Sequence, residues 1–566
     1  MPSRVSFVLV KGPPLMPARG RWLLHAAAAS AVYGLAVLHH QNAASFADLP
    51  TDAVLALDRA VSIARFEALP LRGNPVGIAW FGVAEDYLLA PFLVGVSSLE
   101  GLLARASLFH ALLAPLGYAL GVAFRRPSLG LAWGGFWATL PALVALSRDY
   151  PVNYRTTHWV LAALVCAVFL ARDTRSPGQR VLWTWLLLLS AALAMASHPL
   201  ALGALPAALL VAGVWGRPWR SSSQDVAGRA EEQRVGKPRG LGWAVIGAVV
   251  ATLLVSGTYL ISNVGPYIEL LTSRSEDPQL SMGEAFRGSV AALKMLPDSA
   301  IVPAGAGPAL LLVLGVVPAV ILPVGRAAAT WVAAWTALSF VAFSVAGYAA
   351  SPWHLTPVVQ PVLALGFVGW ASALAPTAYP SRVRMLAHWV LAAGLVALWL
   401  PGVAPSPPRT ATSPVASFSG LADRLVERTE QGQGLAYFEA QARCGMDWSP
   451  EATVLDLRLR SGAAAFRQTS PDAPLLALVE DVPSLQSLGL DGLQDRFVLP
   501  NGVAMKLYVA EQAGPWIDRF RRGCTIGDRS PTLLDVPMVV GGNAAPKGFE
   551  TCVLPAPCPS YRTPLP

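Results

Sequence analysis

"WLLHAAAASAVYGLAVL", residues Trp22 to Leu38, is the first long apolar stretch of the chain and carries no acid, lysine or arginine. A helix needs about 20 mainly apolar residues to cross a bilayer, because lipid offers no partner for backbone N–H and C=O groups. A basic leader precedes this stretch and small residues follow it, as in a secretory signal peptide. Its apolar core is longer than a typical signal core, so we expect a retained membrane span.

The composition of the whole chain is that of a membrane protein. Of its 566 residues, 54% are hydrophobic and 13% are charged, whereas a soluble domain has about 25% charged residues. The net charge of +8 would also suit a nucleic-acid binder. In a polytopic protein, however, a basic excess marks cytoplasmic loops attracted to anionic lipid, so we expect membrane lipid and no nucleic acid as a partner.

Apolar windows recur along the chain and predict a mostly α polytopic protein with about eleven transmembrane helices. The windows lie near residues 22–39, 103–124, 128–147, 157–172, 181–197, 199–216, 241–262, 301–323, 327–348, 356–377 and 384–403. A further apolar run, "YLLAPFLVGVSSLEGLL" from Tyr87 to Leu103, is interrupted by Pro91, Gly95 and Glu100. We interpret it as one helix lying at the membrane interface. If it were a span, every later segment would change sides.

The distribution of basic residues predicts the orientation of the chain. With the N-terminus in the cytoplasm, the inside segments hold 18 Lys and Arg residues, and the outside segments before the C-terminal tail hold 9. This asymmetry is the one that membrane insertion favours. We therefore expect a bacterial inner membrane or equivalent, a cytoplasmic N-terminus and an extracytoplasmic tail after the last span.

The composition changes after the Pro-rich linker "PGVAPSPPRT", which divides the chain into a membrane domain, residues 1–404, and a small soluble α/β or α+β domain, residues 405–566. The stretches "LAYFEA", "ATVLDLRLR", "PLLALVEDV" and "GVAMKLYVAE" are predicted strands, and "SGLADRLVERTEQGQG" is a predicted helix. The tail also contains Cys444, Cys524, Cys552 and Cys558, which predict two disulfides with three possible connectivities. Cys166 stands alone in the fourth span and is expected to be a small buried side chain.

Ionisable and aromatic residues stand close to the predicted outer ends of the spans. Each is more often a solvated loop residue than a site residue, but together they predict one polar cavity at the outer membrane face. The members of this collection are Asp52, Glu85, Asp86, Asp149, Tyr154, Arg155, His158, Tyr267, Arg274, Lys294, Trp353 and His354. Arginine and lysine in this collection suit a phosphate, whereas His354 beside Trp353 suits either a substrate contact or an interfacial anchor.

The order and spacing of these motifs resemble the GT-C fold polyprenyl-phosphate-sugar glycosyltransferases, the group that includes protein mannosyltransferases and the lipid A aminoarabinose transferase. The matching segments are "DAVLALDRA" (Asp52 to Ala60), "GVAEDYLLAPFLVGVSSLEGLLAR" with Tyr87 and Arg105, "LPALVALSRDYPVNYR", and "WHLTPVVQPVLALG". The chain departs from the family pattern at Ala53, where an acid is common, and at "AED" (Ala84 to Asp86) before the tyrosine.

The resemblance implies transfer of a sugar from a lipid-linked donor to an acceptor on the extracytoplasmic face, with inversion at the anomeric carbon. Such a reaction needs a carboxylate that orients or deprotonates the acceptor hydroxyl, and donors that stabilise the leaving phosphate. We expect Asp52 to be the general base, with Asp48 as the alternative, and Glu85 or Asp86 as a further catalytic carboxylate. Asp52 is equally placed to cap the helix that begins there. The expected substrate-binding residues are Tyr87, Arg105, Tyr154, Arg155, His158, Arg274, Lys294 and His354.

Three other functions were weighed against the transferase. A transporter is disfavoured because the spans contain almost no charge and no internal repeat, and a lipid-linked polymerase because the longest outside segment is early in the chain. A non-catalytic polytopic protein that presents the tail to a partner is the main alternative. No cofactor is expected, since a divalent metal has no cluster of residues with ligand spacing to support it.

Overall fold

The structure is a computed structural model, and its description covers residues 18–44, 51–71, 75–76, 79–80, 82–124, 126–140, 143–144, 147, 151–171, 177–215, 239–272, 281–294, 312–345, 347, 352–373, 386, 389–391, 393–394, 423, 436–442, 455–456, 459–460, 475–481, 492–498, 504–512, 515 and 549–554. Helices dominate this part of the chain, which confirms the predicted mostly α class. They are α1 (Ala18–Ala44), α2 (Thr51–Ala64), α3 (Ala84–Leu89), η1 (Ala90–Leu93), α4 (Leu99–His110), α5 (Leu113–Ala123), α6 (Pro127–Thr139), α8 (Pro151–Leu170), α9 (Pro177–Ser197), η2 (Pro199–Gly203), α10 (Ala204–Trp215), α11 (Arg239–Thr272), α12 (Met282–Lys294), α14 (Val316–Ile321), α15 (Pro323–Val345) and α16 (Pro352–Ala373).

Five helical segments are long and apolar enough to cross a membrane: Trp22–Asn42, Leu99–Ala123, Gly178–Ser197, Gly325–Val345 and His354–Ala373. Shorter apolar helices lie at Tyr154–Leu170, Ala201–Trp215, Val249–Gly265 and Leu312–Ile321. Large apolar side chains face outward on several of them; Ile261 on α11, for example, is 80% exposed. A helix with such an outer surface requires lipid around it, so the chain is an integral membrane protein. The count of eleven spans stays a prediction, because most of residues 384–403 lie outside the described part.

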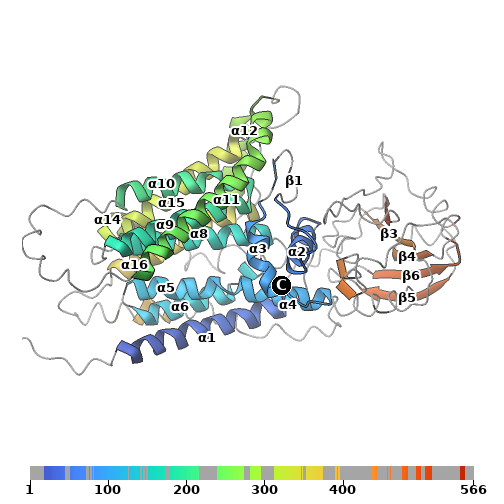
Figure 1. Ribbon diagram of the computed structural model, residues 1–566, viewed down its shortest axis with the longest axis horizontal. Helices are drawn as coiled ribbons and strands as arrows, with labels where there is room; N and C mark the ends of the chain where they lie inside the picture. The colour runs from blue at the N-terminus through green and yellow to red at the C-terminus, as the bar shows by residue number, and fades with distance from the viewer. Residues whose placement is uncertain are drawn as a thin grey trace, which may run out of the picture.

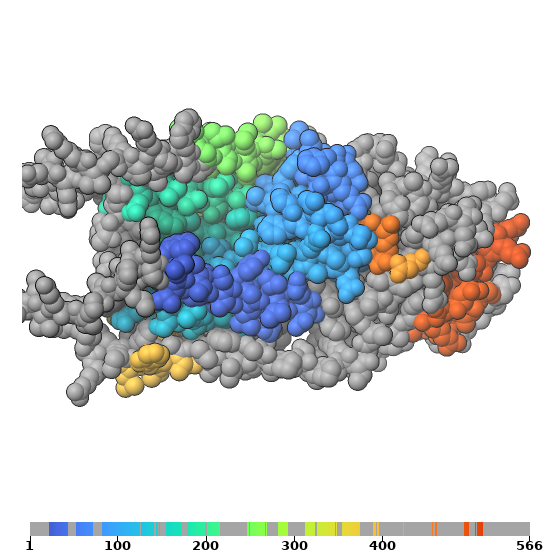
Figure 2. Space-filling model, turned by 60° about the horizontal axis from the view of Figure 1, so that its bottom comes forward, coloured from blue at the N-terminus to red at the C-terminus, as the bar shows by residue number. Residues whose placement is uncertain are grey.

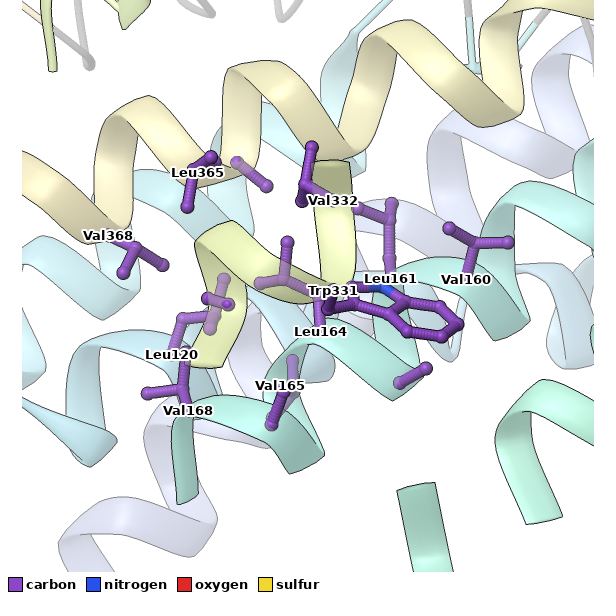
Figure 3. Packing of buried hydrophobic residues seen from close by; sticks show 14 of the residues in the cluster. Leu120, Val160, Leu161, Leu164, Val165, Val168, Trp331, Val332, Leu365 and Val368 are labelled. Atoms are coloured by element: carbon purple, nitrogen blue, oxygen red, sulfur yellow. The ribbon is translucent and has the colours of Figure 1, made fainter. Parts of the chain in front are cut away.

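Helix α8 forms the centre of the helical bundle. From Trp159 to Leu170 it is apolar all round, as expected of a helix buried on every side, and it packs against α5, α9, α15 and α16. Leu161, Leu164 and Val168 of α8 are fully buried and lie with Trp331 of α15 in one cluster (Figure 3). The ends of α8 are therefore fixed by the core, which makes its first turns a rigid support for functional groups.

Close packing of α5 against α6 depends on glycine. A Cβ atom on Gly121 would lie 2.2 Å from the backbone nitrogen of Gly130, and one on Gly117 would lie 3.1 Å from the Cα atom of Gly134. Small residues at such crossings let two helix backbones approach closely, which is the usual means of helix association in lipid.

The segment from Tyr87 to Leu103 is not the single interfacial helix that we predicted. It comprises the end of α3, the short η1, a turn, and the start of α4. Gly95 adopts a φ of 74°, a conformation that glycine adopts without strain. Ser98 then caps α4 by accepting a hydrogen bond from the backbone nitrogen of Gly101 at 3.2 Å. The break arises because Gly95 and Ser98 give the backbone a turn and a cap that the uniform apolar pattern conceals.

The C-terminal strands form a five-stranded mixed sheet in the order β5-β6-β4-β3-β7. Strand β3 pairs in parallel with β4 and β7, and β6 pairs antiparallel with β4 and β5. The strands are β3 (Ala436–Ala442), β4 (Leu475–Glu480), β5 (Leu493–Val498), β6 (Ala504–Ala510) and β7 (Phe549–Leu554), and a separate pair consists of β1 (Pro75–Val76) and β2 (Ala79–Trp80). The predicted strands at "LAYFEA", "PLLALVEDV" and "GVAMKLYVAE" are confirmed as β3, β4 and β6.

The predicted strand at "ATVLDLRLR" is wrong, because Leu455, Asp456, Leu459 and Arg460 are helical. Its alternating pattern suits a strand, but Asp456 and Arg460 form an ion pair at the i, i+4 spacing of a helix. The division at residue 404 remains a prediction. The two predicted disulfides also remain predictions, since Cys444, Cys524 and Cys558 and the side chain of Cys552 lie outside the described part, whereas Cys166 is buried and free, as expected.

Candidate functional site

Asp86 is the centre of a buried ionic cluster at one end of the helical bundle. Its Oδ2 atom accepts a hydrogen bond from Nε of Arg59 on α2 at 2.8 Å, and its Oδ1 atom accepts one from Nη1 of Arg155 on α8 at 3.2 Å. All three side chains are at most 10% exposed. The cluster therefore joins three elements that are far apart in the sequence, and α2 and α3 lie together where α8 begins (Figure 1).

The local sequence explains why these groups meet. Helix α3 starts at Ala84, so Glu85 and Asp86 occupy its first turn, where the helix dipole favours acids. Helix α2 is strongly amphipathic, and its buried face carries Arg59 among alanine and valine. Arg155 stands in the second turn of α8, whose position the core fixes.

Glu85 points to different neighbours from those of Asp86. Its Oε1 atom accepts a hydrogen bond from the indole N–H of Trp159 on α8, and Ser197, the last residue of α9, hydrogen-bonds to the same carboxyl group. Burial raises the pKa of Glu85 to about 8, against the opposing effects of Arg155, Ser197 and Trp159. Glu85 is consequently mostly protonated at neutral pH.

Two of the three guanidinium nitrogens of Arg155 donate no hydrogen bond to a described residue. It is 2% exposed, and its Nε and Nη2 atoms have no hydrogen-bond partner within the described part of the chain. Arg155 shares the carboxylate of Asp86 with Arg59, and a protonated Glu85 adds no second negative charge beside it. A buried guanidinium with N–H donors left over in this way is suited to an anion.

A separate small cavity of about 20 Å³ has room for one or two water molecules. Thr156, the neighbour of Arg155, lines it together with His198 and His354, whose rings meet edge to face at a centroid distance of 5.8 Å. Burial, and then the nearby His354, lowers the pKa of His198 to about 3. His354, which we expected at the site, thus lines this cavity and not the ionic cluster; the two are linked along the chain by Arg155 and Thr156 and by Ser197 and His198.

Tyr154 and His158 also come together on α8, but in an aromatic cluster with α1 and α4. The Tyr154 hydroxyl donates to the backbone oxygen of His110 at 2.5 Å, and His158 stacks on Phe109 at a centroid distance of 5.9 Å. His40 on α1 packs against Tyr154. These contacts fix the first two turns of α8, and hence Arg155, against α1 and α4.

Two predicted substrate-binding residues have backbone partners. The Tyr87 hydroxyl donates to the backbone oxygen of Pro70 at 3.1 Å, and the Arg105 side chain donates to the backbone oxygen of Val94. Both bonds close loops around α3 and η1. Asp52 lies in the first turn of α2, but its side chain, that of Lys294, and all of Arg274 lie outside the described part.

Three members of the site were not singled out from the sequence: Arg59, Trp159 and Ser197. Arg59 had a usable signal, since an arginine on the apolar face of a predicted helix needs a buried counter-charge. Trp159 and Ser197 had none, because neither a tryptophan nor a serine at the end of an apolar helix is unusual. Among the described residues no group of His, Cys, Asp and Glu could hold a metal ion.

The comparisons with known proteins give structural neighbours only. No family model matches the chain, and no curated protein matches it. Two solved structures of ArnT from Cupriavidus metallidurans match the chain. The structure in the apo state has 14% identity and a TM-score of 0.44, and the match covers 88% of this chain and 98% of the ArnT chain. The other, bound to undecaprenyl phosphate, has 13% identity and a TM-score of 0.43 over 87% and 98%.

Proposed function

We propose that this chain is an integral membrane glycosyltransferase that moves a sugar from a polyprenyl-phosphate donor to an acceptor on the extracytoplasmic face, with inversion. The observation that carries the proposal is Arg155, a buried guanidinium that pairs with Asp86 and has two nitrogens without a hydrogen-bond partner among the described residues. Such a group suits a phosphate that must be stabilised as it leaves. Its place at the end of membrane helices suits a donor that arrives through the lipid.

Asp86 is better suited to positioning than to taking a proton. Each of its carboxylate oxygens already accepts a hydrogen bond from an arginine. A general base needs an oxygen within reach of the acceptor hydroxyl, whereas Asp86 holds Arg155 and Arg59 in fixed orientations. The role of proton acceptor therefore passes to an acid outside this ion pair.

Asp52 is the acid that we assign to this role. It precedes Arg59 by seven residues on α2, which is two turns, so both positions fall on one face of the helix about 10 Å apart along its axis. A single displacement at the anomeric carbon requires one base on the acceptor side and cationic donors on the phosphate side. Asp52 and Arg155 supply these two requirements in our mechanism, and Glu85 stays neutral so that it does not cancel the positive charge.

The test is to replace Asp52 by Asn and to measure two quantities with the protein in lipid nanodiscs. We expect sugar transfer from radiolabelled polyprenyl-phosphate sugars to fall by at least about a hundredfold, the contribution of a general base. Binding of polyprenyl phosphate itself should remain unchanged. The matched control is Glu100→Gln, which neutralises an exposed acid on α4 and should transfer at the wild-type rate.

Transfer that survives Asp52→Asn would contradict the assignment of the base. A wild-type protein that neither binds polyprenyl phosphate nor consumes any donor of a broad panel would contradict the transferase itself. The chain would then be the alternative, a polytopic membrane protein that presents its C-terminal part to a partner.

A further inference from the structure

A helical segment near the C-terminus is seated on the membrane part of the chain. The four described residues of this segment are Leu455, Asp456, Leu459 and Arg460, and the first three are at most 4% exposed. In the space-filling view this segment, in orange, lies against the blue surface of the helices around α4 (Figure 2). The contact is therefore closely packed, although the sequence predicted only a soluble tail beyond a linker.

Asp456 completes the N-terminus of α4 from far along the chain. Its Oδ1 atom accepts a hydrogen bond from the backbone nitrogen of Leu99, the first residue of α4, at 2.7 Å. The first four N–H groups of a helix lack partners within it. Ser98 satisfies one of them, that of Gly101, and Asp456 satisfies another and places a negative charge where the helix dipole favours it.

Arginine side chains hold this contact together. Nε of Arg460 lies 3.1 Å from both carboxylate oxygens of Asp456, which fixes the orientation of the cap. Nη2 of Arg65, just after α2, donates to the backbone oxygens of Val96 at 3.0 Å and of Leu459 at 3.4 Å. One guanidinium thus connects the end of α2, the turn before α4, and the C-terminal segment.

We propose that the C-terminal segment around Asp456 is a positioning element for the membrane site, which holds α4 by capping it and α2 through Arg65. Helix α2 carries Arg59 six residues before Arg65, and Arg59 fixes Asp86. The segment therefore acts on Arg155 through α2 and Asp86 without touching the reacting groups. The effect on catalysis rests on the proposed function, whereas the effect on α2 and α4 does not.

The experiment compares Asp456→Ala with Asp456→Asn in the full-length protein in nanodiscs. Hydrogen exchange measured by mass spectrometry should become about fivefold faster at the first turn of α4 and the end of α2 in Asp456→Ala, the effect of losing one helix cap. Asp456→Asn keeps an oxygen that accepts from Leu99, so it should recover most of the protection. The control is Asp423→Ala, which removes an exposed partner of Arg460 and leaves the cap intact.

The second measurement is the concentration of donor at half-maximal transfer. We expect this KM to rise several-fold in Asp456→Ala, to return towards the wild-type value in Asp456→Asn, and to be unchanged in Asp423→Ala. If Asp456→Ala does not accumulate, Arg460→Gln takes its place, because it removes the side chain that fixes the orientation of the Asp456 carboxylate.

Wild-type exchange in Asp456→Ala would overturn the cap, and faster exchange with an unchanged KM would overturn the positioning role. Hydrogen exchange needs no enzymatic activity. Failure of the proposed function, seen as no transfer by the wild type, is therefore distinct from failure of the cap.

Discussion

The protonation of Glu85 gives the sharpest test of the ionic cluster. A carboxyl group whose pKa rises from 4.5 in the unfolded chain to about 8 by burial binds its proton more tightly in the folded state. The free energy of unfolding should then be highest below about pH 4.5, fall as the pH rises towards 8, and level off above it. At about 1.4 kcal/mol for each pH unit, the full range corresponds to at most about 5 kcal/mol.

Glu85→Gln removes the titrating proton and keeps both the shape of the side chain and an oxygen that accepts the hydrogen bond of the Trp159 N–H. We expect the variant to match the wild type near pH 5 and to exceed it increasingly above pH 6. By pH 8 the difference should be several kcal/mol. Thermal unfolding in detergent micelles of fixed composition, from about pH 5 to 8.5, measures this difference directly.

The exposed Glu100 provides the control, since Glu100→Gln should follow the wild-type curve throughout. If the free energy of unfolding depended on pH in the same way for Glu85→Gln and the wild type, the reasoning would be refuted. Glu85 would then have the same pKa in the folded and the unfolded chain. The neutral carboxyl group assigned to Glu85 at neutral pH would then be ionised instead.

Two further predictions follow from packing and charge. Arg155→Ala leaves the buried Asp86 with one arginine in place of two and should destabilise the protein by about 3 to 5 kcal/mol in thermal unfolding, while Arg155→Lys should cost less because a cation remains. Gly121→Ala should lower the yield of folded protein in size-exclusion chromatography, because its Cβ would lie 2.2 Å from the backbone nitrogen of Gly130. Gly257→Ala, where nothing lies within 4 Å, should leave the yield unchanged.

The sequence predicted the helical membrane architecture well because lipid imposes a strong and local constraint. Apolar windows of sufficient length appear wherever the chain must satisfy its own backbone, and the described helices α1, α9, α15 and α16 follow them. Turns and helix caps within an apolar run were harder to predict. The turn at Gly95 and the cap at Ser98 are single residues within an apolar run, and the alternation of "ATVLDLRLR" fits a strand although its Asp456–Arg460 pair belongs to a helix.

The sequence identified several residues of the candidate site but did not predict how they pair. The sequence indicated that Asp86 and Arg155 stand at the ends of helices, but which acid meets which base depends on how the helices pack. The position of Arg59 on the apolar face of a helix indicates a buried counter-charge, but only the placement of α2 against α3 and α8 identifies that counter-charge as Asp86. Tyr87 and Arg105, which the family motifs assign to substrate binding, bond to the backbone oxygens of Pro70 and Val94, and their substrate role stays a prediction.

The two adjacent acids of α3, Glu85 and Asp86, differ in their contacts and in their charge state. Successive residues on a helix project about 100° apart, so Glu85 faces the tryptophan and serine of α8 and α9, whereas Asp86 faces two arginines. The negative charge of Asp86 orients both guanidinium groups. Glu85 contributes no negative charge at neutral pH, because burial raises its pKa to about 8. A second ionised acid here would weaken the attraction of Arg155 for an anion. The proposed phosphate site therefore depends on the difference between the two carboxyl groups, and polyprenyl phosphate should bind more weakly above pH 8 to the wild type but not to Glu85→Gln. Equal loss of binding in both would place the titrating group elsewhere.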